Sequence, residues 1–320
     1  MFGKLKKKIL ISLIAAGIIY LAFTIYADYN KVLSAFSQFD WVILPLLLLL
    51  SLGNYLTRFV KWDYYLSIIN VDIKKYDSIS IFMSGLIMSI TPGKVGEFLK
   101  AYLVREVSKA PVSKTAPVIF AERITDFLSL LLIAIIGAYA FDYGVNVSIS
   151  VTVFFIIIIF IISNKKISLT ILNSLERISF TKKYLINLHK AYESSYRLLR
   201  PKPLLTMTIV SLISWGFECL GYYLILLNFK IDFGFFWASF SYAFATIIGA
   251  VSMLPGGLGV TEGSLTFLLI DKGVANNVAV TTTFIVRVVT LWFAVLVGIF
   301  SVTVYQKRFG IINFDSVNNQ

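Results

Sequence analysis

Cysteine and histidine are almost absent from this sequence. The 320 residues contain one cysteine, Cys219, and one histidine, His189. A disulfide framework or a CxxC site needs at least two cysteines, and a structural zinc site needs about four Cys or His ligands. The HExxH motif of zinc proteases needs two histidines. The sequence therefore excludes these kinds of site, and we expect neither a metal nor a cofactor.

Charged residues are also scarce. They make up 14% of the chain, against 58% hydrophobic residues, whereas soluble domains have about 25% and about 45–50%. This composition excludes a soluble globular enzyme and a disordered chain. It predicts an all-α, polytopic integral membrane protein forming a single membrane domain, residues 1–320. Apolar runs close to the ~20 residues that cross a bilayer occupy residues 9–27, 41–56, 118–139, 147–162, 204–228 and 281–305.

Two further apolar stretches are interrupted. Residues 79–104 are broken by TPGKVGE, and residues 237–270 are broken by LPGGLGVTEG. Each apolar arm is short or ends at Pro-Gly, which favours a hairpin of two half-helices over one straight crossing. The sequence thus predicts a helical bundle of about six full spans plus two re-entrant broken-helix hairpins. Eight full spans are the alternative.

The basic residues test this topology. In the six-span arrangement the outside segments hold three basic residues, Lys31, Lys230 and Lys272, whereas residues 164–203 alone hold nine on the inside. This asymmetry predicts a multi-pass protein of the cell membrane with both termini in the cytoplasm. The eight-span alternative moves residues 105–117, which include three basic side chains, to the outside. Topology explains the net charge of +12, so no nucleic-acid role is expected.

Residues 164–203 form a basic segment with an amphipathic pattern. Apolar side chains recur at helical spacing at Leu185, Leu188, Tyr192, Tyr196 and Leu199. An amphipathic helix on an anionic inner leaflet fits this pattern. A solvated connector with a few apolar contacts fits it equally well.

The two interrupted stretches belong to an internal repeat. Repeat 1 covers about residues 79–140 and repeat 2 about residues 237–305. Arg123 follows Pro92 by 31 positions, and Arg287 follows Pro255 by 32. Three full crossings separate the hairpins, so the repeats would enter the membrane from opposite faces, as in the inverted repeats of secondary transporters. Chance resemblance between apolar helices is the alternative.

Charged residues inside the predicted spans are the candidate binding groups, because such residues usually face a partner or a polar cavity. Glu122, Arg123 and Asp126 share one helix face, where Arg123 can pair with either carboxylate; an ion pair that only orients helices is the alternative. Arg287 has no nearby carboxylate on its own helix, so its partner is either Glu262 or an anionic ligand such as phosphate. Arg58, Lys61 and Trp62, after the second apolar run, are interpreted as interface anchors.

The glycine-rich breaks are candidate anion sites, because a turn that leads into a helix presents unpaired backbone N–H groups. A carboxylate in the first turn of the following half-helix can cap these groups, hold an arginine or bind a cation. The residues concerned are Gly93, Lys94, Gly96 and Glu97 in the first break, and Gly256, Gly257, Gly259 and Glu262 in the second.

Four motifs in order, PGKVGEFLKAYLV, AERITDFLSLLL, LPGGLGVTEGSL and IVRVVTLWF, resemble the lysylphosphatidylglycerol synthase transmembrane (flippase-like) family. In aminoacyl-phosphatidylglycerol synthases such a membrane region moves the modified lipid between leaflets, and a separate soluble domain makes it. About fifteen residues follow the last predicted span, so we expect lipid handling without aminoacyl transfer. Lys94 stands where the resemblance leads us to expect arginine, which keeps the charge and loses the bidentate fork.

The predicted function is translocation of an anionic lipid, a phospholipid or a polyprenyl-phosphate-linked lipid, by a protein that is not an enzyme. One alternative is a membrane anchor for a separately encoded glycosyltransferase or lipid synthase, held through residues 164–203. Another is an intramembrane lipid-modifying enzyme with Glu122 and Asp126 as acid and base.

Overall fold

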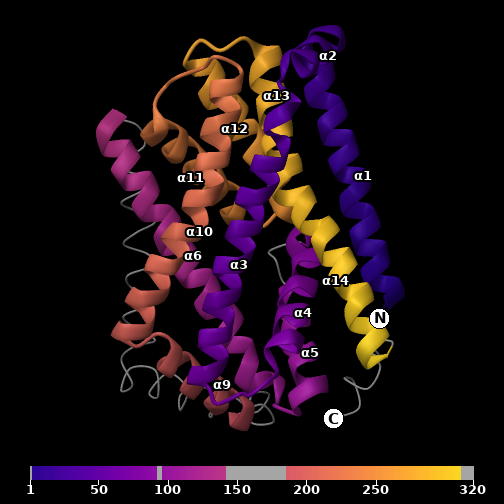
Figure 1. Cartoon of the computed structure of the whole chain (residues 1–320), viewed down its shortest axis with the longest axis vertical. Coiled ribbons are helices and arrows are strands. Elements are labelled where there is room, and N and C mark those ends of the chain that lie inside the picture. Colours follow the sequence, from indigo (N-terminus) through magenta and orange to yellow (C-terminus); the bar gives the residue numbers. More distant parts are fainter. Residues whose placement is uncertain (1, 92–95, 142–184, 311–320) are drawn as a thin grey trace.

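The computed structural model describes residues 2–91, 96–141 and 185–310, and within these ranges the chain is helical, without strands (Figure 1). The all-α class expected from the sequence is confirmed for this part of the chain. The longer elements are α1 (Phe2–Tyr26), α2 (Tyr29–Gln38), α3 (Leu44–Ile68), α4 (Lys75–Gly85), α5 (Leu99–Ser108), α6 (Val112–Phe141), α9 (Leu185–Leu198), α10 (Pro201–Asn228), α11 (Phe235–Val251), α12 (Val260–Asp271), α13 (Asn276–Arg287) and α14 (Phe293–Phe309).

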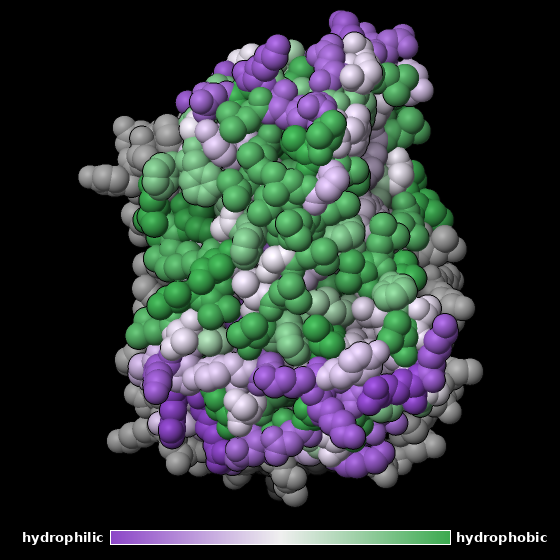
Figure 2. Space-filling model, in the orientation of Figure 1, coloured by the Kyte–Doolittle hydropathy of each residue, from purple (hydrophilic) through white to green (hydrophobic). Residues whose placement is uncertain are grey.

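Three continuous helical segments among the described residues are long and apolar enough to cross a membrane: Trp41–Ile68, Pro201–Asn228 and Asn276–Phe309. Helices α1 and α2 qualify together as a fourth, and the chain bends by 97° between them. Figure 2 shows the corresponding surface, an apolar band between polar residues at the two ends. The predicted span at 147–162 lies outside the described residues.

Helix α3 differs from its prediction in length. The apolar run ends near residue 56, but the helix continues to Ile68 and carries Arg58 and Lys61 inside it. Lys61 is fully buried, so its interpretation as an interface anchor is wrong. The helix can continue because buried groups on other helices form ion pairs and hydrogen bonds with these two side chains.

The first interrupted stretch turns back on itself. After α4 the chain tightens into the 3₁₀ turn η2 (Leu86–Ile90), and α5 then packs beside α4 at the lower end of Figure 1. Lys114 Nζ, at the start of α6, donates to the Asn70 carbonyl (3.0 Å) in the α3–α4 connection. The α5–α6 and α3–α4 connections therefore lie at the same end of the molecule, as a re-entrant hairpin requires.

The second interrupted stretch turns back at the other end. Helix α11 runs inward, the 3₁₀ turn η5 (Pro255–Gly257) follows, and α12 returns beside α11 near the upper end of Figure 1. Gly256, Gly257 and Gly259 have φ angles of 60°, 68° and 82°, a left-handed conformation that glycine adopts without a steric penalty. The turns η2 and η5 contact each other, so the tips of the two hairpins meet inside the bundle.

Helices α13 and α14 form one rod, Asn276–Phe309, with the π-helical turn η6 (Val288–Trp292) between them. A π turn widens the helix and disturbs its carbonyl pairing. Two hydroxyls of α3 donate to carbonyls of this turn: Ser51 Oγ to Val289 (2.7 Å) and the Tyr55 hydroxyl to Thr290 (2.9 Å).

Helix α9 is the described part of the basic segment. It packs against α6 and α3, and Leu198 and Leu199 at its end are buried. Of the predicted apolar positions, Leu199 is thus buried against the bundle. Residues 164–184 lie outside the described part of the chain.

Candidate functional site

The first group of charged residues, the Asp126 cluster, joins α3, α6 and α10. Lys61 Nζ donates to Asp126 Oδ1 (2.5 Å) and to Ser211 Oγ (2.7 Å). The Ser211 hydroxyl in turn donates to Asp126 Oδ1 (3.1 Å). Lys61 also reaches the Thr125 hydroxyl (3.2 Å) and the Glu122 carbonyl (3.3 Å). Such multiple hydrogen bonding is what allows a lysine to remain fully buried.

Two arginines complete this cluster. The Nη2 atoms of Arg58 and Arg123 each lie 3.4 Å from Asp126 Oδ2, and Arg123 Nη2 is 3.1 Å from Glu97 Oε2. The single Asp126 carboxylate therefore faces three cations from two helices. Arg123 and Glu97 link the cluster to the half-helix after the first break.

Glu122 and Lys100 form a separate ion pair of 2.6 Å between α6 and α5. Both side chains are buried, and Lys100 Nζ also lies over the rings of Trp62 (4.7 Å) and Phe82 (5.1 Å). Gly85 makes room for this lysine, because a Cβ there would lie 2.6 Å from Lys100 Cγ.

The second group, the Glu262 cluster, surrounds the second break. Arg287 Nε donates to Glu262 Oε1 (2.7 Å), and Arg287 Nη2 donates to the Gly256 carbonyl (2.5 Å). The Gly259 amide donates to Glu262 Oε2 (2.8 Å), which caps the start of α12. One carboxylate thus neutralises the arginine and the N-terminal end of the half-helix.

Helix α1 reaches this cluster through one tyrosine. The Tyr20 hydroxyl donates to Glu262 Oε1 (3.3 Å) and accepts from Trp292 Nε1 (2.9 Å). The Tyr20 ring lies 4.8 Å from the ring of Phe284. Tyr20 therefore ties the first helix to α12 and to the α13–α14 rod.

The three arginines lie deep in their helices. Arg58 is ten residues from the end of α3, and Arg123 and Arg287 are each eleven residues from the starts of α6 and α13. At 1.5 Å per residue these are depths of about 15–16 Å, half of a ~30 Å hydrocarbon core. Charge at that depth is retained only with partners or in a polar cavity.

The structure brings together most of the residues expected from the sequence. The glutamate after each break contacts the arginine of the following helix, Glu97 with Arg123 and Glu262 with Arg287. Of the two carboxylates predicted as partners for Arg123, Asp126 contacts it, whereas Glu122 pairs with Lys100. Gly96 donates its amide to the Thr91 hydroxyl (3.0 Å), and Gly93 and Lys94 lie outside the described residues.

The sequence did not predict that three basic residues, Arg58, Lys61 and Lys100, would form ion pairs with Asp126 and Glu122. A signal existed, because Glu122 and Asp126 inside an apolar helix need cations from elsewhere. Arg58 and Lys61 are three residues apart and so share a helix face. In the described ranges, no three His, Cys, Asp or Glu side chains group as metal ligands.

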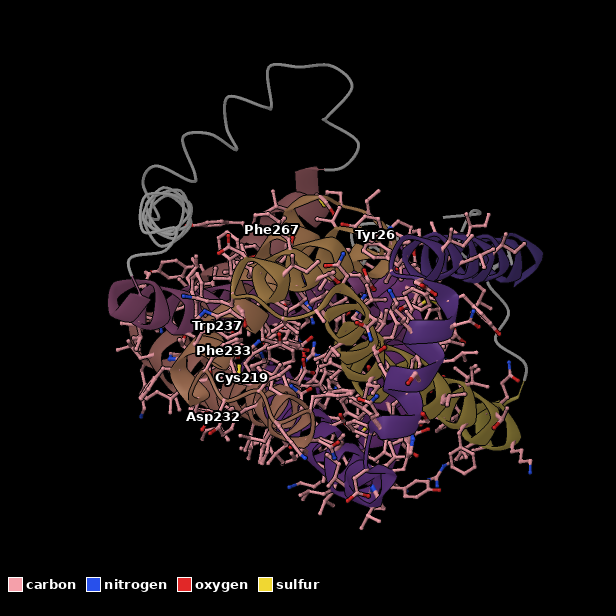
Figure 3. The ribbon with its side chains drawn as sticks, turned by 90° about the horizontal axis from the view of Figure 1, so that it is seen from above. Tyr26, Cys219, Asp232, Phe233, Trp237 and Phe267 are labelled. Carbon is pink, nitrogen blue, oxygen red and sulfur yellow. The ribbon has the colours of Figure 1, made fainter. Side chains whose placement is uncertain are left out.

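A shallow depression of about 410 Å³ lies at the upper end, away from the helix interiors that hold the two clusters. It is formed by the α10–α11 and α12–α13 connections, with Lys230, Asp232 and Lys272 among its lining residues. Figure 3 looks onto this end and shows Asp232, Phe233 and Trp237 close together. The Asp232 carboxylate accepts from the Gly234 amide (3.0 Å) and the Tyr223 hydroxyl (3.3 Å), so it shapes the connection.

Comparison with known proteins gives consistent results. Residues 8–298 match the family described as the lysylphosphatidylglycerol synthase TM region. A UPF0104 membrane protein of Methanothermobacter thermautotrophicus is 24% identical over 88% of this chain and 89% of its own length. One of Pyrococcus horikoshii is 23% identical over 85% of this chain and 90% of its own. One of Methanocaldococcus jannaschii is 24% identical over 66% and 91%.

Proposed function

Because this chain belongs to the lysylphosphatidylglycerol synthase TM region family, we propose that it moves an anionic lipid between the two leaflets of the cell membrane. The substrate is a phospholipid or a polyprenyl-phosphate-linked lipid. Both termini face the cytoplasm in this proposal, and the first hairpin enters from that side.

The observation that carries the proposal is the position of the buried charges. Arg123 and Arg287 lie about 16 Å from opposite ends of the bundle by helix rise, on helices that follow the two hairpin tips. The tips themselves meet. A polar path between the leaflets has to pass this level, where hydrocarbon would otherwise exclude a phosphate.

The paired glutamates allow a lipid phosphate to dissociate from the buried arginines. Glu97 contacts Arg123 and Glu262 contacts Arg287, so each arginine has an internal anion that a lipid phosphate would displace. When the phosphate leaves, the glutamate returns and the buried arginine is neutralised again. Binding that is too strong would stop transport, and this exchange limits it.

The test is lipid movement in proteoliposomes that contain the full chain. Fluorescent phosphatidylglycerol, a fluorescent polyprenyl phosphate and fluorescent phosphatidylcholine are each incorporated, and an impermeant reductant then quenches the label in the outer leaflet. We expect an anionic lipid to become quenched from both leaflets faster than in protein-free vesicles, with phosphatidylcholine much slower.

A matched pair of variants connects this rate to the buried charges. Glu97→Gln/Arg123→Gln removes an ion pair at mid-depth, and Glu193→Gln/Arg197→Gln removes the exposed pair on α9 (2.6 Å). We expect the first to lose most of the excess rate and the second to keep it. Equal rates in both variants would contradict the proposal, and movement of no anionic lipid would favour the anchoring role for a separate lipid enzyme.

A further inference from the structure

The two arginines of the Asp126 cluster carry unused hydrogen-bond donors. Within the described residues, Arg58 Nε, Arg123 Nε and Arg123 Nη2 are buried without a hydrogen-bond acceptor. The contacts of Arg123 Nη2 with Glu97 and Asp126 are ion-pair distances without hydrogen-bond geometry. Buried donors of this kind are rare in proteins and call for an explanation.

The cations nearby do not share this property. Lys61 donates to oxygens of Asp126, Ser211, Thr125 and Glu122. Arg287 uses both Nε and Nη2 in hydrogen bonds, to Glu262 and Gly256. The unused donors are therefore concentrated on Arg58 and Arg123, which meet at Asp126 Oδ2.

Solvent exposure also distinguishes the two arginines from the other side chains of the Asp126 cluster. The side chain of Arg123 is 24% exposed and that of Arg58 is 12% exposed, whereas those of Lys61 and Asp126 are 0% and 4% exposed. Arg58 and Arg123 are thus the partly exposed side chains of the cluster, and Lys61 with Ser211 holds Asp126 from the buried side.

We infer that Arg58 and Arg123 together form a binding site for a phosphate anion, with Asp126 holding the two guanidinium groups side by side. Each guanidinium presents planar N–H donors that match phosphate oxygens. A phosphate here would accept from the unused donors and add negative charge where two carboxylates, Asp126 and Glu97, face three cations. The inference rests on the proposed function and concerns its contacts at the first break.

The experiment measures binding to the purified full chain in detergent micelles by calorimetry. Dioctanoyl phosphatidylglycerol is the lipid probe, glycerol 1-phosphate is a free phosphate monoester without acyl chains, and dioctanoyl glycerol lacks the phosphate. The variants are Arg58→Lys, Arg123→Lys and both together, which keep the charge and remove the fork. Arg197→Lys on the exposed face of α9 is the matched control, and thermal unfolding of each protein reports its folding.

We expect the phosphatidylglycerol Kd to rise roughly ten- to a hundredfold in each single variant, because a charge-assisted hydrogen bond is lost. Arg197→Lys should leave this Kd unchanged. Binding of glycerol 1-phosphate as tight as that of the lipid would assign the site to a free phosphate ester. An unchanged Kd in the folded double variant, equal binding of dioctanoyl glycerol, or no binding of either phosphate to the wild type would overturn the inference.

Transport distinguishes this site from the proposed function. If the double variant moves phosphatidylglycerol at the wild-type rate, the site is wrong and translocation stands. If the wild type binds through these arginines and moves no lipid in vesicles, translocation is wrong and the site stands.

Discussion

The Lys100–Glu122 pair allows a quantitative test of the buried charges, with Lys100→Met, Glu122→Leu and the double variant compared with the wild type. Both side chains are buried and 2.6 Å apart. Removing one partner of a buried pair costs about 3–5 kcal/mol, whereas replacing both by apolar residues is often neutral. We therefore expect the double variant to unfold with nearly the wild-type free energy.

The two single variants should differ from each other. In Glu122→Leu, Lys100 keeps the rings of Trp62 and Phe82 at 4.7 and 5.1 Å, and a desolvated cation–π contact contributes about 2 kcal/mol. This variant should lose roughly 1–3 kcal/mol. In Lys100→Met, Glu122 Oε2 loses its ammonium partner, and Oε1 accepts no hydrogen bond from the described residues, so the full loss of about 3–5 kcal/mol is expected.

The assay is equilibrium unfolding of the four proteins in mixed micelles with increasing dodecyl sulfate. The coupling free energy from the cycle should be about 4 kcal/mol or more. The exposed pair Glu193–Arg197, taken through the same cycle, should give about 0.3–0.5 kcal/mol. Single-variant losses that add to the double-variant loss within about 0.5 kcal/mol would show that the two buried charges do not stabilise each other.

Three further predictions follow from single contacts. Gly298→Ala should destabilise the protein, because its Cβ would overlap the Ile87 backbone, whereas Gly216→Ala, with open space around it, should stabilise α10 by about 0.5–1 kcal/mol; thermal unfolding compares them. Tyr20→Phe should cost about 1–3 kcal/mol in the same measurement, because Trp292 Nε1 and Glu262 lose a partner; an unchanged melting temperature would show that α1 is not held through this hydroxyl. In a Cys219→Ser background, an impermeant maleimide applied to intact cells should label Lys31→Cys and leave Glu106→Cys unlabelled until lysis, since these positions lie at opposite ends of the bundle. Labelling of both would support eight spans.

The sequence was sufficient for features that local chemistry determines. Pro92 and Pro255 with the glycines after them indicated the two breaks, and the spacing to Arg123 and Arg287 indicated comparable helices behind them. Glu262 was expected to cap a half-helix or to hold Arg287, and the structure has it in both contacts.

The parts that escaped prediction depend on contacts between distant segments. Lys61 follows an apolar run, and that position alone suggests an interface; its burial is caused by Asp126 and Ser211, 65 and 150 residues away. Helix α2 lies between the first two predicted spans, where no helix was predicted, and it forms because Val32 and Ala35 become buried when the chain bends after α1. Hydropathy averaged along the chain therefore predicts neither the burial of Lys61 nor the formation of α2.

The α13–α14 rod has a mechanical consequence. It touches both hairpins, through Arg287 at the second break and through Gly298 against Ile87 in the first. These two points are eleven residues apart, about 16 Å along one helix, and the π turn lies between them. If the rod moves as a rigid body, a displacement of one hairpin tip therefore also displaces the other. Bending of the rod at the π turn would uncouple the two. The hydroxyls of Ser51 and Tyr55, bonded to the carbonyls of that turn, set the stiffness of this joint.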